Sequence, residues 1–217
     1  MLFDLHYTAT ILPLLAQASL VTLKATLLGF LLAATLGLAL AILRMAPSRW
    51  LRWSVTGLVE FIRSTPLLIQ IFFLYFVLPE AGINLDALTA GVLALGLHYG
   101  AYCSEVYRAG FEGLPKGQWE ACTALNMSPL ATWKNIIIPQ AIPPIVPALG
   151  NYLVALFKET PLLSAIAVLE LMQTAKILGS ESFRYVEPIT LVGLFFLVFS
   201  LVSAFLIRWV ERYLNHR

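Results

Sequence analysis

Long apolar stretches separated by short polar connections make up most of the chain. A helix needs about 20 predominantly apolar residues to cross the hydrocarbon layer of a membrane. Five stretches meet that length and predict membrane-spanning helices at residues 20–43, 55–78, 87–109, 141–161 and 188–207. Residues 4–18 mix polar and apolar side chains, which indicates a lead-in at the membrane interface, and the apolar run 162–171 is long enough only for a re-entrant or interfacial segment.

The longest polar interruption covers residues 114–139, between the third and fourth predicted spans. Its pattern predicts two short amphipathic helices. Pro115 is favoured at the start of the first helix, and Asn126 tolerates the left-handed conformation that ends a helix. Ser128 precedes a proline, and this pair fits the N-cap and first position of a second short helix that runs to about Ile136.

The composition indicates that the predicted helices belong to a membrane protein. The 217 residues are 59% hydrophobic and 12% charged, with a mean hydropathy of +0.83. This is too apolar for an ordinary soluble domain and predicts an all-α integral membrane protein. The net charge of +2, spread along the chain, does not suggest nucleic acid as a partner. The cysteines, Cys103 and Cys122, and the three histidines lack metal-ligand spacing, so we expect no metal site and no bound cofactor.

Basic residues mark the connections that we expect in the cytoplasm. The connection after the first span carries three arginines, whereas residues 1–19 contain neither Lys nor Arg. The N-terminus is therefore expected outside, and the arginine-rich C-terminus inside. This orientation places the connection 79–86 and the polar segment 173–187 outside, although the second holds two basic residues, and it places the loop 114–139 in the cytoplasm.

Small residues recur every four positions in two of the predicted spans. They are Gly29, Ala33, Gly37 and Ala41 in the first span, and Gly96 and Gly100 in the third. Because such stripes let two helices approach closely, the sequence predicts helix-packing faces inside the membrane.

Two pairs of opposite charge stand one helical turn apart near the predicted cytoplasmic ends, Glu60 with Arg63 and Glu105 with Arg108. The spacing favours intrahelical ion pairs. For the first pair a gate or subunit-contact role is equally open, and for the second an orienting or docking role is favoured over a solute contact. Pro66 removes a helical hydrogen bond and predicts a kink in the second span, whose freed carbonyl can face a cavity.

The sequence KGQWEACTALNMSPLATWKNIIIP resembles the cytoplasmic EAA loop of ATP-binding cassette (ABC) importer permeases, close to the polar amino acid uptake family. The family pattern is Glu-Ala-Ala, three residues, Gly, nine residues and Ile-x-Leu-Pro. Its places are held here by Glu120, Ala121, Cys122, Asn126, Ile136, Ile138 and Pro139. The three departures keep the side-chain volume, the turn or the apolar character. Two further stretches, EFIRSTPLL and AYCSEVYR, resemble the Arg-x-Thr-Pro-Leu-Leu and Ala-Tyr-x-x-Glu-x-x-Arg signatures of that family.

The resemblance implies a type I ABC importer permease in the bacterial inner membrane, with the loop as a coupling helix that docks on an ATPase. The residues that it assigns to this docking are Gly117, Gln118, Glu120, Ala121, Cys122, Leu125, Asn126 and Pro139. The implied partners are two ABC ATPase subunits that use ATP and Mg²⁺, a second permease chain, identical or different, a periplasmic or lipid-anchored substrate-binding protein, and a small polar solute. The chain holds no Walker A pattern, so we expect that it is not itself an enzyme.

Polar residues in the second, third and fourth spans predict the solute path. We place it beside Pro66, Leu67, Leu68, His98, Asn151, Lys158 and Glu159. A polar amino acid, or a zwitterionic compatible solute such as the ectoine of a related branch, requires both charge signs there. Lys158 and Glu159 supply both signs, but a structural ion pair between the fourth span and its neighbours explains them equally well, and hydrogen-bonded packing also explains His98.

A channel or secondary transporter that is not driven by ATP is the main alternative function. It predicts an inverted internal repeat, which the sequence does not show. A membrane enzyme requires a nucleophile with its base or a metal-ligand cluster, and a purely structural subunit does not require Arg63, Lys158 and Glu159 in or beside the membrane. The ATP-driven permease is the favoured interpretation.

Overall fold

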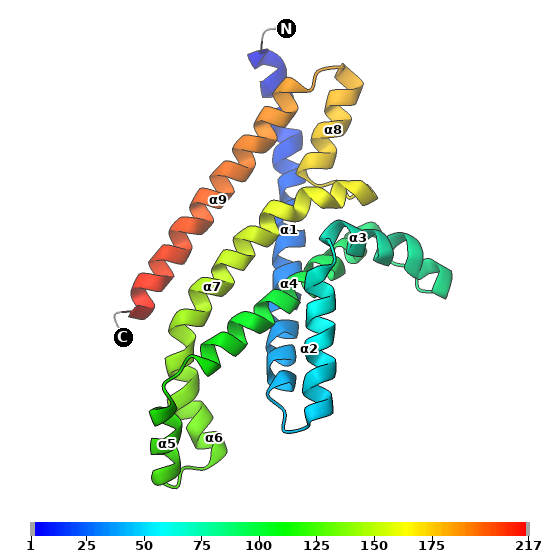
Figure 1. Ribbon diagram of the computed structural model, residues 1–217. Helices are drawn as coiled ribbons and strands as arrows, with labels where there is room; N and C mark the ends of the chain where they lie inside the picture. The colour runs from blue at the N-terminus through cyan, green and yellow to red at the C-terminus, as the bar shows by residue number, and fades with distance from the viewer. Residues whose placement is uncertain (1–2, 216–217) are drawn as a thin grey trace.

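The computed structural model describes residues 3–215, which form helices and connecting turns with no β-strand among them (Figure 1). The long helices are α1 (Leu5–Arg44), α2 (Arg49–Ser64), α4 (Ala87–Glu112), α7 (Ile138–Glu159) and α9 (Val186–Asn215). The shorter ones are α3 (Leu67–Phe72), η1 (Phe73–Val77), η2 (Leu78–Ala81), α5 (Lys116–Ala124), α6 (Pro129–Thr132), η3 (Trp133–Ile137), η4 (Thr160–Ile166) and α8 (Leu171–Ser182). The predicted all-α class is confirmed.

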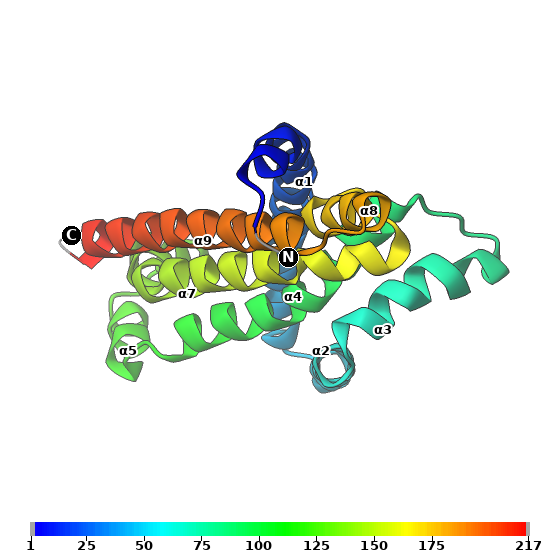
Figure 2. The same cartoon turned by 90° about the horizontal axis from the view of Figure 1, so that it is seen from above.

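The elements divide between two ends of an elongated molecule. Figure 1 shows the N-terminus and α8 at one end, and the α1–α2 turn, α5, α6 and the C-terminus at the other. Helices α9, α7 and α4 pack side by side in that order, and the arm formed by α3, η1 and η2 extends sideways (Figure 2). The predicted loop 114–139 and the C-terminus therefore share one end, as the expected topology requires. The connection 82–86 lies at the tip of the arm rather than beside the N-terminus.

Helix α1 is longer than the predicted first span. It begins at Leu5, where the Asp4 carboxylate accepts hydrogen bonds from the N–H groups of His6 and Tyr7, and it continues to Arg44. The residues expected as an interfacial lead-in, 4–18, belong to the same helix from Leu5 onwards, and their place at the membrane interface stays a prediction. Their polar side chains do not interrupt it: the Thr8 hydroxyl, for example, donates back to the Asp4 carbonyl at 2.7 Å.

The two small-residue stripes pack against each other where α1 crosses α4. A Cβ added at Gly37 would lie 2.6 Å from the Cβ of Cys103 and 2.9 Å from the Gly100 carbonyl oxygen. One added at Gly96 would overlap the side chain of Leu32. Only glycine permits this backbone approach, so the predicted packing face is confirmed.

The predicted second span is broken rather than kinked. Helix α2 and the segment Leu67–Ala81 meet at an angle of 102°. Thr65 and Pro66 are both extended, as the residue before a proline prefers, and they separate the two helical segments. The carbonyls freed at the break do not stay open, because Gln70 Nε2 donates to those of Ile62 at 2.8 Å and Thr65 at 3.2 Å.

The polar loop folds as a helical hairpin around Asn126, which has a φ of 55°. The N–H of Met127 donates to the Cys122 carbonyl and that of Asn126 to the Thr123 carbonyl, both at 3.0 Å, which is the hydrogen-bond pattern of a Schellman motif. Ser128 caps α6 by accepting from the N–H of Ala131. Both turn predictions are confirmed.

The second helix of the hairpin does not end near Ile136 as expected. It continues from α6 through the π-helical η3 into α7, so that residues 129–166 form one helical segment. Pro139 lies at the second position of α7, where a missing N–H is tolerated, and the widened turn of η3 precedes it. The apolar run 162–171 then forms most of the 3₁₀ turn η4 and a short link to α8. This run is not a span of its own.

Three helical segments within residues 3–215 are long and apolar enough to cross a membrane: Leu5–Arg44, Pro129–Ile166 and Val186–Leu214. The broken pair Arg49–Ser64 and Leu67–Ala81 is a fourth if it counts as one span. Helix α4, the expected third span, is not among them, since its glycines, tyrosines and His98 lower its hydropathy. The count of five spans and the orientation remain predictions.

Candidate functional site

A cavity of about 460 Å³ lies where the break in the second span faces α4 and the end of α7. Pro66, Leu67 and Leu68 line it from the break, His98 and Tyr102 from α4, and Glu159 from the last residue of α7. Five of the seven residues of the predicted solute path thus come together. They come together because Pro66 stops α2 and because α4 and α7 pack against each other.

Arg63 also lines this cavity, although the sequence suggested an intrahelical ion pair, a gate or a subunit contact for it. Its Nη1 lies 3.1 Å from Glu60 Oε1 and 3.4 Å from Glu105 Oε1, and its guanidinium carbon lies 5.2 Å from the centre of the Tyr102 ring. Its Nε is buried and has no hydrogen-bond partner. Arg63 therefore lines the cavity and carries one buried donor that is left unsatisfied.

Glu159 presents the opposite charge. Its Oε2 is buried without a hydrogen-bond partner, while Tyr99 of α4 lies beside the carboxylate. A buried carboxylate oxygen left unpaired is costly, and such an atom is expected to find a partner when the site is occupied. Arg63 and Glu159 thus line the same cavity with opposite charges, and each keeps one unsatisfied polar atom.

Lys158 and Asn151 are the two path residues that the structure does not bring to the cavity. Both are exposed and neither lines it. Neighbours on an α-helix point about 100° apart, and Lys158 and Glu159 form no ion pair with each other within residues 3–215. The alternative of a structural ion pair between the fourth span and its neighbours is not seen there for either residue. The cation that lines the cavity together with Glu159 is Arg63.

His98 is buried inside α4, and its Nδ1 lies 3.3 Å from Gln70 Oε1. Its ring contacts the rings of Tyr99 and Tyr102 at centroid distances of 5.6 and 5.2 Å. Gln70 is also the residue whose side-chain amide donates to the carbonyls at the break in the second span. His98 therefore links the cavity wall to the break, a packing function that is compatible with a place beside a solute.

Both predicted intrahelical ion pairs form, and Glu105 joins them into one network. Its carboxylate lies 2.6 Å from Arg44, 3.4 Å from Arg63 and 2.8 Å from Arg108. Arg108 also binds Glu112 at the end of α4. Sequence reasoning missed Arg44, which closes the first span, because no spacing rule relates it to a residue 61 positions away.

The predicted coupling loop has a buried and an exposed side. Cys122 is buried, and Trp119 packs edge-on against Trp133 with ring centroids 5.5 Å apart. On the other side, Leu125 and Leu130 are 75% and 78% exposed. Large apolar side chains at a hairpin tip indicate a partner surface.

The remaining loop residues assigned to docking lie around this tip. Glu120, Ala121 and Asn126 are exposed, and nothing lies within 4 Å of a Cβ added at Gly117. Gln118 accepts a hydrogen bond at 3.1 Å from Gln140 of α7, one position after the exposed Pro139. Cys122 is buried beneath this exposed tip and does not form part of its surface.

Comparison with known proteins gives a consistent result along the whole chain. Residues 25–216 match the family described as binding-protein-dependent transport system inner membrane component. A probable amino-acid ABC transporter permease protein, y4tG of Sinorhizobium fredii, is 45% identical over 208 residues, which cover 96% of this chain and 90% of the relative. The arginine transport system permease protein ArtQ of Bacillus subtilis is 33% identical, with 98% of both chains covered.

Solved structures are similar over the same length. A crystal structure of an amino acid ABC transporter with histidines superposes with a TM-score of 0.93 at 34% identity, covering 98% of this chain and 100% of that one. A chain of the MetNI methionine ABC transporter in an inward-facing conformation superposes with a TM-score of 0.81 at 20% identity, covering 94% and 98%, and this likeness concerns the fold alone.

Proposed function

The chain belongs to the family of binding-protein-dependent transport system inner membrane components and is an ABC importer permease subunit, and we propose that it carries a zwitterionic amino acid through the cavity beside Pro66. The observation that carries the proposal is that two residues of opposite charge line this cavity, Arg63 and Glu159, and that each keeps an unsatisfied atom, Arg63 Nε and Glu159 Oε2. An α-amino acid offers a carboxylate to the first and an ammonium group to the second.

The physical argument concerns the cost of leaving these atoms unpaired. Each of these unsatisfied atoms destabilises the empty site, by roughly 1 to 3 kcal/mol. A zwitterion satisfies both groups at once, whereas a purely cationic or anionic solute satisfies only one. The names of the relatives, which refer to amino-acid, cystine and arginine transport, support amino acids over the compatible-solute branch to which ectoine belongs.

The proposal includes the partners that such a permease requires. Two ATPase subunits would dock on the exposed tip around Ala121, Leu125 and Leu130 and hydrolyse ATP with Mg²⁺. A second permease chain, identical or different, would complete the membrane part, and a substrate-binding protein would deliver the solute at the opposite end. Support comes from the apolar tip and from the absence of a Walker A pattern in the sequence.

Transport by the reconstituted importer tests the solute site. Glu159→Gln keeps the shape of the side chain and removes its charge, so we expect solute-stimulated ATPase activity to require about 10- to 100-fold more solute, the loss of one charge-assisted hydrogen bond. Lys158→Gln is the matched control, because Lys158 is exposed and does not line the cavity. Assembly and basal ATPase activity should be unchanged in both variants. If Glu159→Gln and His98→Ala both transport every solute as the parent does, the proposed site is wrong.

A further inference from the structure

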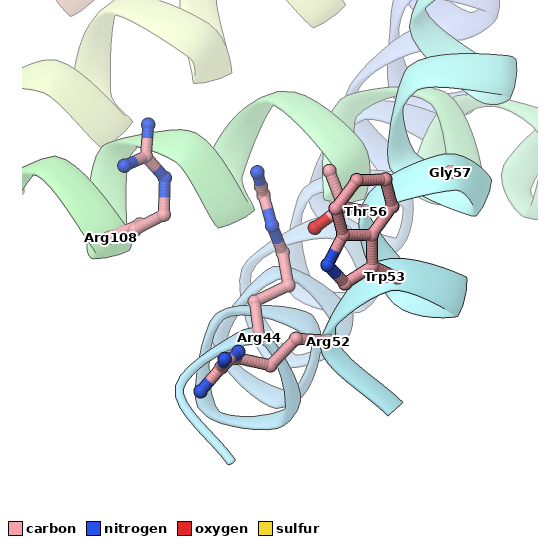
Figure 3. Close-up of a pocket in the computed structure, with 6 residues that line it drawn as sticks. All are labelled: Arg44, Arg52, Trp53, Thr56, Gly57 and Arg108. Atoms are coloured by element: carbon pink, nitrogen blue, oxygen red, sulfur yellow. The ribbon is translucent and has the colours of Figure 1, made fainter. Parts of the chain in front are cut away.

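A second cavity, of about 500 Å³, lies between the end of α1, the start of α2 and the inner part of α4 (Figure 3). Its lining residues are Arg44, Arg52, Trp53, Thr56, Gly57 and Arg108, none of which lines the solute cavity. Figure 3 shows the Arg44 guanidinium between Arg108 on one side and Trp53 and Thr56 on the other. The cavity lies at the end of the molecule that carries α5 and α6, the helices of the proposed coupling loop.

The cavity wall contains three guanidinium groups and no carboxylate. The Arg44 side chain is only 9% exposed and is held from the side by Glu105. Arg108 is held by Glu105 and Glu112. Arg52 donates to a neutral acceptor, the Ala46 carbonyl, at 3.3 Å, and forms no ion pair within residues 3–215.

The charges around the cavity do not balance. The four arginines Arg44, Arg52, Arg63 and Arg108 carry four positive charges, and the glutamates that they contact, Glu60, Glu105 and Glu112, carry three negative charges. One positive charge is left, at the exposed side where Arg52 lies. The site is therefore suited to an anion with several acceptor oxygens, which guanidinium groups bind bidentately.

The surface beside the cavity has the composition of a membrane interface. The segment that starts α2, Ser48 to Trp53, alternates basic and aromatic residues, and Trp50 and Trp53 are 87% and 68% exposed. The Arg49 guanidinium lies 6.0 Å from the centre of the Trp53 ring. Exposed tryptophans next to arginines are typical of the headgroup level of a bilayer. The anion nearest to this cavity is then a lipid phosphate.

We propose that Arg44, Arg52 and Arg108 bind the phosphate of an anionic phospholipid, with Trp53 and Thr56 forming the wall beside the headgroup. Glu105 already holds the Arg44 guanidinium in place, so this group does not have to move when the phosphate binds. Arg52 supplies the positive charge that no glutamate balances. Nothing lies within 4 Å of a Cβ added at Gly57, so the wall leaves room there for the headgroup. Basic pockets between membrane helices bind anionic headgroups in this way.

Native mass spectrometry of the delipidated importer complex, with phosphatidylglycerol or phosphatidylcholine added back, tests the site. We expect the parent to retain phosphatidylglycerol in preference to phosphatidylcholine. Arg52→Gln should lower the retention of phosphatidylglycerol about fivefold, the effect of one basic residue near a lipid surface, without loss of assembly. Trp53→Leu should lower it as well.

Arg208→Gln on α9 is the matched control, because it removes an exposed charge at the same end but away from the cavity, and it should retain lipid as the parent does. Equal retention of both lipids by the parent, or retention unaffected by Arg52→Gln, overturns the proposal. Displacement of phosphatidylglycerol by equimolar inorganic phosphate would show a site for free anions and overturn the assignment to lipid.

Discussion

The guanidinium of Arg63 lies 3.4 Å from the carboxylate of Glu105, and this contact joins the two cavities of the molecule. Arg63 lines the solute cavity, whereas Arg44 and Arg108, the other partners of Glu105, line the cavity at the coupling end. A single carboxylate therefore holds three cations in place. We expect a solute that draws Arg63 away from Glu105 to disturb the contacts of Glu105 with Arg44 and Arg108, at the end of α4 that leads to α5.

Removing the shared carboxylate should destabilise the permease. In Glu105→Gln three closely spaced guanidinium groups lose their common anion, and we expect a loss near the lower end of roughly 3 to 5 kcal/mol, because Glu105 is partly exposed. The Tm of the purified protein in detergent measures it. Glu60→Gln is the control: its side chain is 54% exposed and contacts Arg63 alone, so the loss should stay below about 1 kcal/mol. Equal losses in the two variants would contradict the shared role of Glu105.

Local rules were sufficient for the turns and the packing stripes. Asn126 is predictable because few residues other than glycine adopt a positive φ, and Ser128 because its hydroxyl satisfies a free N–H. The glycines at 37 and 100 meet because close helix contact requires small side chains on both partners. Each of these features depends on a few neighbouring residues or on a fixed spacing.

The candidate site was only partly predictable, because it depends on the directions in which side chains leave their helices and on contacts between residues far apart in the sequence. Proline at position 66 indicated a weak point in the second span, but it did not indicate a bend of 102° or the hydrogen bonds from Gln70 to the carbonyls of the break. Lys158 and Glu159 are adjacent in sequence and diverge in direction, so the cation of the site is Arg63, almost a hundred positions earlier. Helix lengths were misjudged where polar side chains bond within the helix, as at Thr8.

The exposed tip of the hairpin should be needed for ATPase binding and dispensable for folding. Ala121→Asp and Glu120→Lys change the charge of exposed positions, so we expect normal membrane insertion with at least a tenfold loss of ATPase co-purification. Glu181→Lys on α8 is the control, since it makes the same charge change at the opposite end of the molecule. Normal association and transport in both tip variants would remove the coupling assignment.

The predicted orientation can be read from cysteine labelling with a membrane-impermeant reagent. Asn84→Cys and Glu181→Cys should react in intact cells, whereas Pro47→Cys and Lys116→Cys should react only after permeabilisation, because basic connections stay in the cytoplasm. All four positions are exposed. The parent serves as the blank, because Cys103 and Cys122 are both buried. Labelling of position 116 in intact cells would show that the predicted orientation is wrong.

Stability should fall as the pH rises through the range in which Glu170 ionises. This carboxylate caps α8, accepts hydrogen bonds from the N–H groups of Met172 and Gln173, and is completely buried. Burial raises its pKa to about 7, more than these hydrogen bonds and Lys176 lower it. The folded protein then holds a proton that the unfolded chain has released, so between about pH 4.5 and 7 the free energy of unfolding decreases, by up to roughly 3 kcal/mol. In Glu170→Gln, which cannot ionise, the Tm should fall less over this range, whereas Glu120→Gln, an exposed control, should follow the parent. A parallel pH dependence of the parent and Glu170→Gln would show that Glu170 does not change its protonation on unfolding.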